Sequence, residues 1–229
     1  MINKEEKKEI ILRPITELKS IDYPERPENI KPEEFDVIKD NIDKNAYIIG
    51  NEIVLHQKGI PKTLSTDKKG ANKFINDLEE DQKIKNENDI YVKLPPIQKE
   101  LCKRIQEPHD PIKREKNKCN EKILIAVRDA SELEHSRDCD HQRISNELPK
   151  LKEKKMRAEN ITKDDITGEP LKPNAVAHHI ERKADDPKSA LDMTNIAILN
   201  PETHIEGHKN NFEGKENYEQ FKKNKQAKK

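Results

Sequence analysis

Four histidines and two short apolar runs lie close together near the C-terminal end of the chain, and their order constrains the local fold. Residues 175–180 alternate weakly and residues 196–199 (IAIL) are continuously apolar, so both are expected to be short β-strands. The segment between them is polar and contains Pro187. The pattern therefore predicts an antiparallel strand pair joined by a long loop.

A helix is expected to follow the second run directly. Asn200 is a favoured N-cap residue, and Pro201 suits the first position of a helix. The helix then carries His204 and His208, four residues apart, which places both imidazoles on one face. Such a pair is often plain helix surface, but here it follows another histidine pair.

That other pair, His178-His179, ends the first predicted strand. Adjacent strand residues point to opposite faces, so one of the two could join His204 and His208 around a metal ion while the other remains apart. Spacing alone leaves open which one. Three neutral nitrogen ligands would favour a transition metal over magnesium and leave coordination positions for water and substrate.

This set of residues resembles the motif of the HNH (ββα-metal) endonucleases, in the variant found in the nuclease domains of DNase colicins. In that family the Asn opens the second strand, a histidine follows nine residues later and another follows four after that. Segment 166–171 (ITGEPL) is also similar to the turn that often precedes the first strand of the motif. The resemblance covers about one-fifth of the chain and rests on His178, His179, Asn195, His204 and His208.

The resemblance implies a role for each residue. His178, His204 and His208 would bind one divalent metal ion (Zn, Ni, Mn or Mg, with a transition metal favoured), and His179 would be the general base. Asn195 would tie down the long loop. In addition, Arg182 lies three residues after His179 and could hold the scissile phosphate in a bidentate contact. The chain departs from many HNH proteins by having His178 where they have Asp and by lacking a CxxC zinc framework.

Outside this motif the composition predicts little burial. Charged residues make up 39% of the chain and apolar residues 31%, so one core spanning all 229 residues is not expected. We expect an α+β protein with a mostly helical, charged N-terminal region and a C-terminal ββα-metal (HNH) module. The expected regions are a polar, helical segment at 1–119, a charged helical stem at 120–160, the HNH module at 161–212 and a basic tail at 213–229.

Several local features refine this division. Gly50-Asn51 between two β-prone runs predicts a hairpin over 46–55, and helical spacing predicts helices over 71–80 and 97–107. Pro149 predicts a helix start or a kink within the stem. The remaining four histidines lie in charged surroundings and are expected at the surface: His56, His109, His135 and His141.

The function indicated is hydrolysis of phosphodiester bonds, with double-stranded DNA preferred to RNA. The net charge is zero and residues 162–210 hold six basic against nine acidic side chains, so affinity would depend on the metal, on Arg182 and Lys183, and on the C-terminal lysines. The alternative is a non-catalytic, metal-stabilised module whose N-terminal region binds a protein partner. No apolar segment indicates export or a membrane, so a cytoplasmic protein is expected, with delivery into another cell or host left open.

Overall fold

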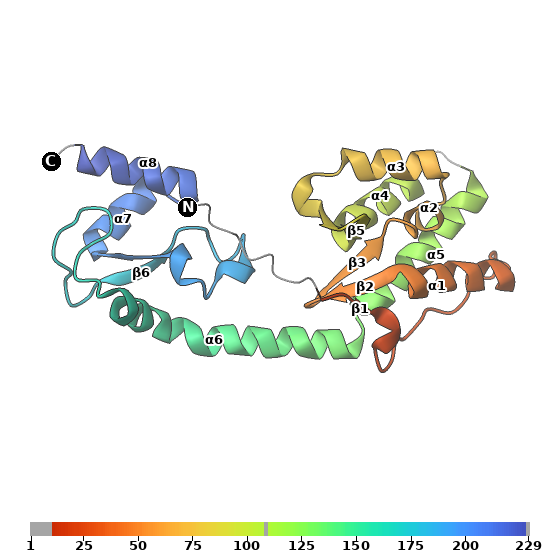
Figure 1. Cartoon of the computed structure of the whole chain (residues 1–229), viewed down its shortest axis with the longest axis horizontal. Helices are drawn as coiled ribbons and strands as arrows, with labels where there is room; N and C mark the ends of the chain where they lie inside the picture. Colours follow the sequence, from red (N-terminus) through yellow and green to blue (C-terminus); the bar gives the residue numbers. More distant parts are fainter. Residues whose placement is uncertain (1–10, 108–109, 228–229) are drawn as a thin grey trace. The chain divides into compact units, whose positions relative to one another are not determined.

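The computed structural model describes residues 11–107 and 110–227 and shows an α+β chain (Figure 1). The chain divides into two compact units, residues 1–137 and 138–229. The described residues form separate apolar clusters in the two units. This agrees with the expectation that one core would not span all 229 residues. None of the helices formed by the described residues combines the length and apolar character that crossing a bilayer requires.

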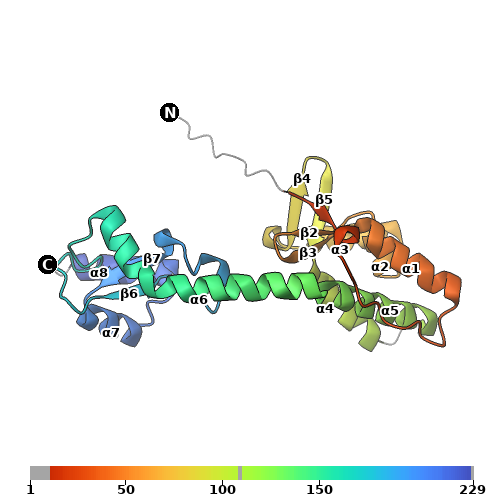
Figure 2. The ribbon, with the colours of Figure 1, turned by 90° about the horizontal axis from the view of Figure 1, so that it is seen from below.

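The N-terminal unit contains an antiparallel sheet that the sequence revealed only in part. The hairpin predicted over 46–55 is confirmed, and Gly50 adopts the left-handed conformation (φ 59°) that its turn requires. A second hairpin, β4–β5, extends the sheet beyond β3 (Figure 2). The strands, in sheet order, are β1 (Arg13–Pro14), β2 (Ala46–Ile49), β3 (Glu52–His56), β5 (Asp89–Lys93) and β4 (Lys83–Asn86).

Helices pack on this sheet and form the main core. Ile42, Leu55, Leu101 and Ile123 come from four different elements and are almost completely buried together. The expectation that the N-terminal region buries little is therefore wrong, because apolar residues that are sparse along the sequence are gathered on one face by the topology. The helices are α1 (Pro32–Asn45), α2 (Ile60–Thr63), α3 (Lys68–Asp77), α4 (Leu94–Gln106) and α5 (Pro111–Arg128), with short 3-10 turns at Ile15–Glu17 and Glu80–Gln82.

The predicted stem at 120–160 is not one element. Residues 120–128 complete α5, and Ile123 and Val127 are fully buried in the N-terminal core. The chain then turns, and helix α6 (Ser131–Glu159) begins. The helix continues through Pro149, so no new helix starts there. The proline still lacks the N–H group that would donate a hydrogen bond within the helix.

The C-terminal unit contains the predicted strand pair and helix. Strands β6 (Val176–His179) and β7 (Ile196–Leu199) pair antiparallel, with His178 opposite Ala197 and His179 opposite Ile196. Helix α7 (Pro201–Lys209) follows at once. The connecting loop contains two short 3-10 turns, Pro187–Ser189 and Met193–Asn195.

The two faces of this small sheet are covered by different elements. On one face, Ile196 and Ile198 pack with Leu151 of α6. On the other face, Ala197 and Leu199 pack with residues that follow α7. Because strand residues alternate, His178 lies on the second face and its neighbour His179 on the first.

The expected basic tail is instead a helix that completes the second face. Helix α8 (Lys215–Gln226) buries Tyr218 against the sheet, and Phe221 packs on the same cluster. Its lysines are partly neutralised, because Lys222 pairs with Asp165 at 2.8 Å and Lys225 pairs with Glu206. The last two lysines, at 228 and 229, lie outside the described residues.

Candidate metal centre

Three of the four clustered histidines meet at one point. His178, His204 and His208 each offer a ring nitrogen, and the three nitrogen atoms lie within 4.8 Å of one another. The ring centroid of His178 is 5.3 Å from that of His204 and 5.5 Å from that of His208. The group could hold a metal ion, and His204 and His208 lie together on one face of α7, as their spacing predicted.

His178 is the buried member of the group. Its ring stacks on Phe212 with centroids 4.2 Å apart, and burial together with the neighbouring His204 and His208 lowers its pKa to about 4. The ring is therefore neutral at pH 7. Its Nε2 atom is buried without a hydrogen-bond partner. A buried polar atom without a partner is costly in a folded protein, and a metal ion bound to this nitrogen would satisfy it.

The two helical histidines complete the group and are progressively more exposed. The pKa of His204 is lowered by burial and by the adjacent His208. The Nε2 atoms of these two rings are 3.0 Å apart, and Nδ1 of His208 lies 2.7 Å from an oxygen of Glu213. His178 is buried, His204 is partly buried and His208 is exposed, so the site is open to solvent on the side of His208.

The start of α7 is fixed by a turn that precedes the strands. Asp164 accepts hydrogen bonds from the backbone N–H groups of Ile166 and Thr167, and its other oxygen accepts one from the N–H of Asn200 at 2.6 Å. Asn200 does not cap α7 with its side chain, which instead bonds the backbone at Lys172 and Pro170. Sequence reasoning missed Asp164, two residues before ITG, although Asp is a typical first residue of such a turn.

His179 lies apart from this group on the opposite face of β6. Its Nε2 atom is 2.9 Å from the carbonyl oxygen of Ala190 in the long loop. A carbonyl only accepts hydrogen bonds, so Nε2 must carry the proton and donate it. In the neutral ring Nδ1 then keeps a free lone pair, as a proton acceptor needs.

Asn195 holds the two ends of the loop together. Its side chain accepts from the N–H of Glu181 at 2.7 Å and donates to the carbonyl of the same residue at 3.0 Å. It also donates to the hydroxyl of Ser189 at 3.0 Å. The residue is buried, and these bonds fix the loop segment that carries Ala190.

The other predicted residues lie outside the group. Arg182 is exposed on the loop and pairs with Asp185 at 3.6 Å. His56 is buried and lies 3.0 Å from Asp89, so its predicted surface position is wrong; it pairs with Tyr91 of β5, a strand that the sequence did not reveal. His135 and His141 are exposed as predicted, and His109 lies outside the described residues.

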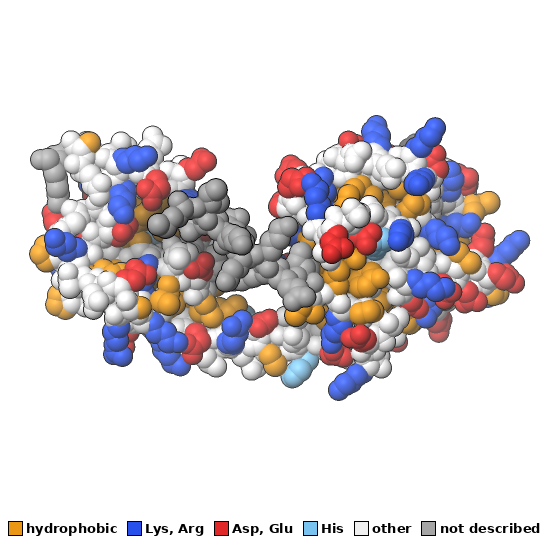
Figure 3. All heavy atoms as spheres, in the orientation of Figure 1, with side chains coloured by type: hydrophobic (Ala, Val, Ile, Leu, Met, Phe, Trp, Pro, Cys, Tyr) orange, Lys and Arg blue, Asp and Glu red, His pale blue; other side chains and the backbone are white. Residues whose placement is uncertain are grey.

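Basic and acidic side chains are interspersed on the face that Figure 3 displays. The three cysteines, all within the described residues, form no disulfide, and Cys119 is buried.

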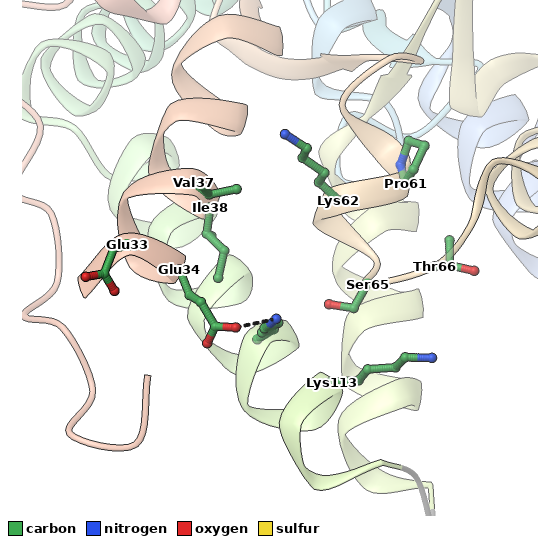
Figure 4. Close-up of a pocket in the computed structure, with 10 residues that line it drawn as sticks. Glu33, Glu34, Val37, Ile38, Pro61, Lys62, Ser65, Thr66 and Lys113 are labelled. Carbon is green, nitrogen blue, oxygen red and sulfur yellow. Dashed lines mark ion pairs between the residues drawn. The ribbon is translucent and has the colours of Figure 1, made fainter. Parts of the chain in front are cut away.

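A separate hollow of about 490 Å³ lies in the N-terminal unit, between α1, the end of α2 and α5 (Figure 4). Val37 and Ile38 line it with the Glu34–Lys116 ion pair, whose charged atoms are 2.9 Å apart. It contains none of the predicted site residues.

Comparisons of the chain with protein-family models, with curated proteins and with solved structures find no match. The site must therefore be interpreted from its own geometry.

Proposed function

We propose that the C-terminal unit is a metal-dependent endonuclease of the HNH type that hydrolyses phosphodiester bonds, with double-stranded DNA as the preferred substrate. One observation carries the proposal. Three histidines converge on one face of β6, while a fourth, on the other face, is held by a backbone carbonyl with one ring nitrogen left to accept a proton. A purely structural metal site has no use for the fourth histidine.

His178, His204 and His208 would hold a divalent ion, and their fit is supported by the unpartnered Nε2 of His178. When bound, the ion would supply neutralisation of phosphate charge and stabilisation of the leaving oxygen. Imidazole ligands favour Zn, Ni or Mn over Mg. Among the described residues the group has three protein donors, whereas structural zinc sites nearly always have four.

His179 would act as the general base. Its Nδ1 would take a proton from the attacking water, while the bond from Nε2 to the Ala190 carbonyl keeps the ring in the required tautomer and orientation. The same carbonyl would stabilise the imidazolium that forms, because its dipole faces the donated N–H.

Asn195 and Arg182 would support this chemistry from the loop. Asn195 would position the base indirectly, by fixing the loop that carries Ala190. Arg182 is 61% exposed and only loosely paired, so its guanidinium is available to bind the scissile phosphate. Lys183 would add to the contact with the nucleic-acid backbone.

The N-terminal unit would bind a partner that directs the nuclease. Its separate core and its own hollow support an independent binding role, with a protein as the expected partner. Cys102, Cys119 and Cys139, all described, form no disulfide, which fits a reducing compartment, and we propose the cytoplasm as the place of action.

A plasmid-cleavage assay with a panel of divalent ions tests the proposal. Wild type should cleave, and His179→Ala should lose about 10²–10⁴ in rate, as removal of a general base does. His141→Ala, at an exposed position on α6, is the matched control and should cleave like wild type. Tight metal binding without cleavage of DNA or RNA would contradict the nuclease and favour the metal-stabilised binding module.

A further inference from the structure

We propose that Glu213 is a positioning residue that fixes the tautomer of His208, so that Nε2 of this ring presents its lone pair to the metal group. Glu213 follows the HNH-like segment and did not stand out in the sequence. The inference rests on the proposed metal site and adds a residue to it.

The contact itself determines the tautomer. An oxygen of Glu213 lies 2.7 Å from Nδ1 of His208. An ionised carboxylate only accepts hydrogen bonds, so Nδ1 must carry the proton. In the neutral ring Nε2 is then unprotonated, and this is the atom that lies 3.0 Å from Nε2 of His204. The carboxylate is bound on the far side of the ring, so it supports the ligand without being one.

The backbone on both sides holds Glu213 in this place. Phe212 is fully buried against His178, and it approaches α7 so closely that a Cβ added to Gly207 would lie 2.4 Å from its ring. On the other side Gly214, with φ 87°, donates its N–H to the carbonyl of Ile180 at 2.8 Å. Glu213 is thus fixed between a buried aromatic residue and a backbone bond to the end of β6.

A carboxylate that accepts from a histidine ligand orients the ring and increases its basicity toward a metal. Removing such a partner typically weakens metal affinity by about 10–100-fold. The Glu213–His208 pair also differs from an ordinary surface ion pair in its burial and in its partner. Only 30% of the Glu213 side chain is exposed, and its partner is a candidate ligand instead of a solvated cation.

The test compares Glu213→Gln and Glu213→Ala with wild type in the full chain. Glutamine keeps the size of the side chain, but its amide can also donate a hydrogen bond to Nδ1, so it should weaken the preference of His208 for the Nδ1-protonated tautomer. Alanine should remove that preference. Glu216→Gln is the matched control, because it removes one carboxylate from an exposed position on α8. The tautomer of His208 is measured by nitrogen NMR on metal-free protein, and Zn²⁺ affinity is measured by calorimetry.

Wild type and Glu216→Gln should show His208 protonated at Nδ1 and bind Zn²⁺ equally well. Glu213→Ala should lose that preference and bind Zn²⁺ about 10–100-fold more weakly, with Glu213→Gln between them. A His208 ring that keeps the Nδ1-protonated tautomer in Glu213→Ala overturns the proposal, whatever the affinity. The tautomer is measured without metal, so failure of wild type to bind Zn²⁺ would contradict the proposed function and not this inference.

Discussion

The two units of the chain differ in the size of the apolar core that stabilises each of them. The N-terminal unit gathers 22 buried residues into one apolar cluster, whereas the C-terminal unit has clusters of five and four on the two faces of a two-stranded sheet. In the second unit His178 lies where an apolar side chain would otherwise pack. Small domains with little core often depend on a bound metal. We therefore expect the proposed ion to stabilise the C-terminal unit and not the N-terminal unit.

The largest effect should come from a truncation in the N-terminal core. Leu124 is fully buried, so Leu124→Ala should lower the free energy of unfolding by about 2–5 kcal/mol. Chemical denaturation measures the loss. Ile112→Ala, on the same helix but 62% exposed, should change it by less than about 0.5 kcal/mol. Equal losses in both variants would show that the apolar cluster does not stabilise this unit.

Metal addition should act on the other unit. Zn²⁺ at 100 times its dissociation constant should stabilise the C-terminal unit by about 2.7 kcal/mol, because it binds the folded state. Hydrogen exchange resolves the two units, and protection should rise in β6, β7 and α7 while the N-terminal sheet stays unchanged. Stabilisation of both units to the same extent would remove the distinction drawn between them.

A smaller effect is expected in the loop. Asn195→Ala should cost about 0.5–1.5 kcal/mol, because it removes the part-buried hydrogen bonds that the side chain makes with the backbone of Glu181. Cleavage should fall less than in His179→Ala, since the base itself remains. Asn72→Ala, at an exposed position in the N-terminal unit, should change neither stability nor cleavage. Wild-type cleavage by Asn195→Ala would argue against a positioning role for the loop.

The same contrast explains what the sequence could predict. Strands β6 and β7 and helix α7 are consecutive, and their signals are local: an apolar run, an Asn-Pro helix start and two histidines four residues apart. The N-terminal sheet joins two hairpins and a short strand that lie far apart in sequence. Its β4–β5 hairpin turns at Glu87 with φ 53°, where no glycine marks the turn. Composition could not reveal that such scattered segments share a core.

Within the site, sequence reasoning found the histidines but not what positions them. The bonds from Asp164 to Asn200 and from Glu213 to His208 join residues whose proximity depends on the folded unit. Helix α8 was hidden because its lysines outnumber its apolar residues, although Tyr218 and Phe221 lie on the face that packs. A basic composition does not exclude a helix that buries only two aromatic side chains.

The most direct test compares two neighbours on one strand. His178 and His179 are adjacent in sequence but face opposite sides of β6, so only the first should bind the ion. A calorimetric Zn²⁺ titration of His178→Ala should show binding abolished, and the same titration of His179→Ala should match wild type. Loss of binding in both variants, or in neither, would contradict the separation of metal ligand and proton acceptor on which the account depends.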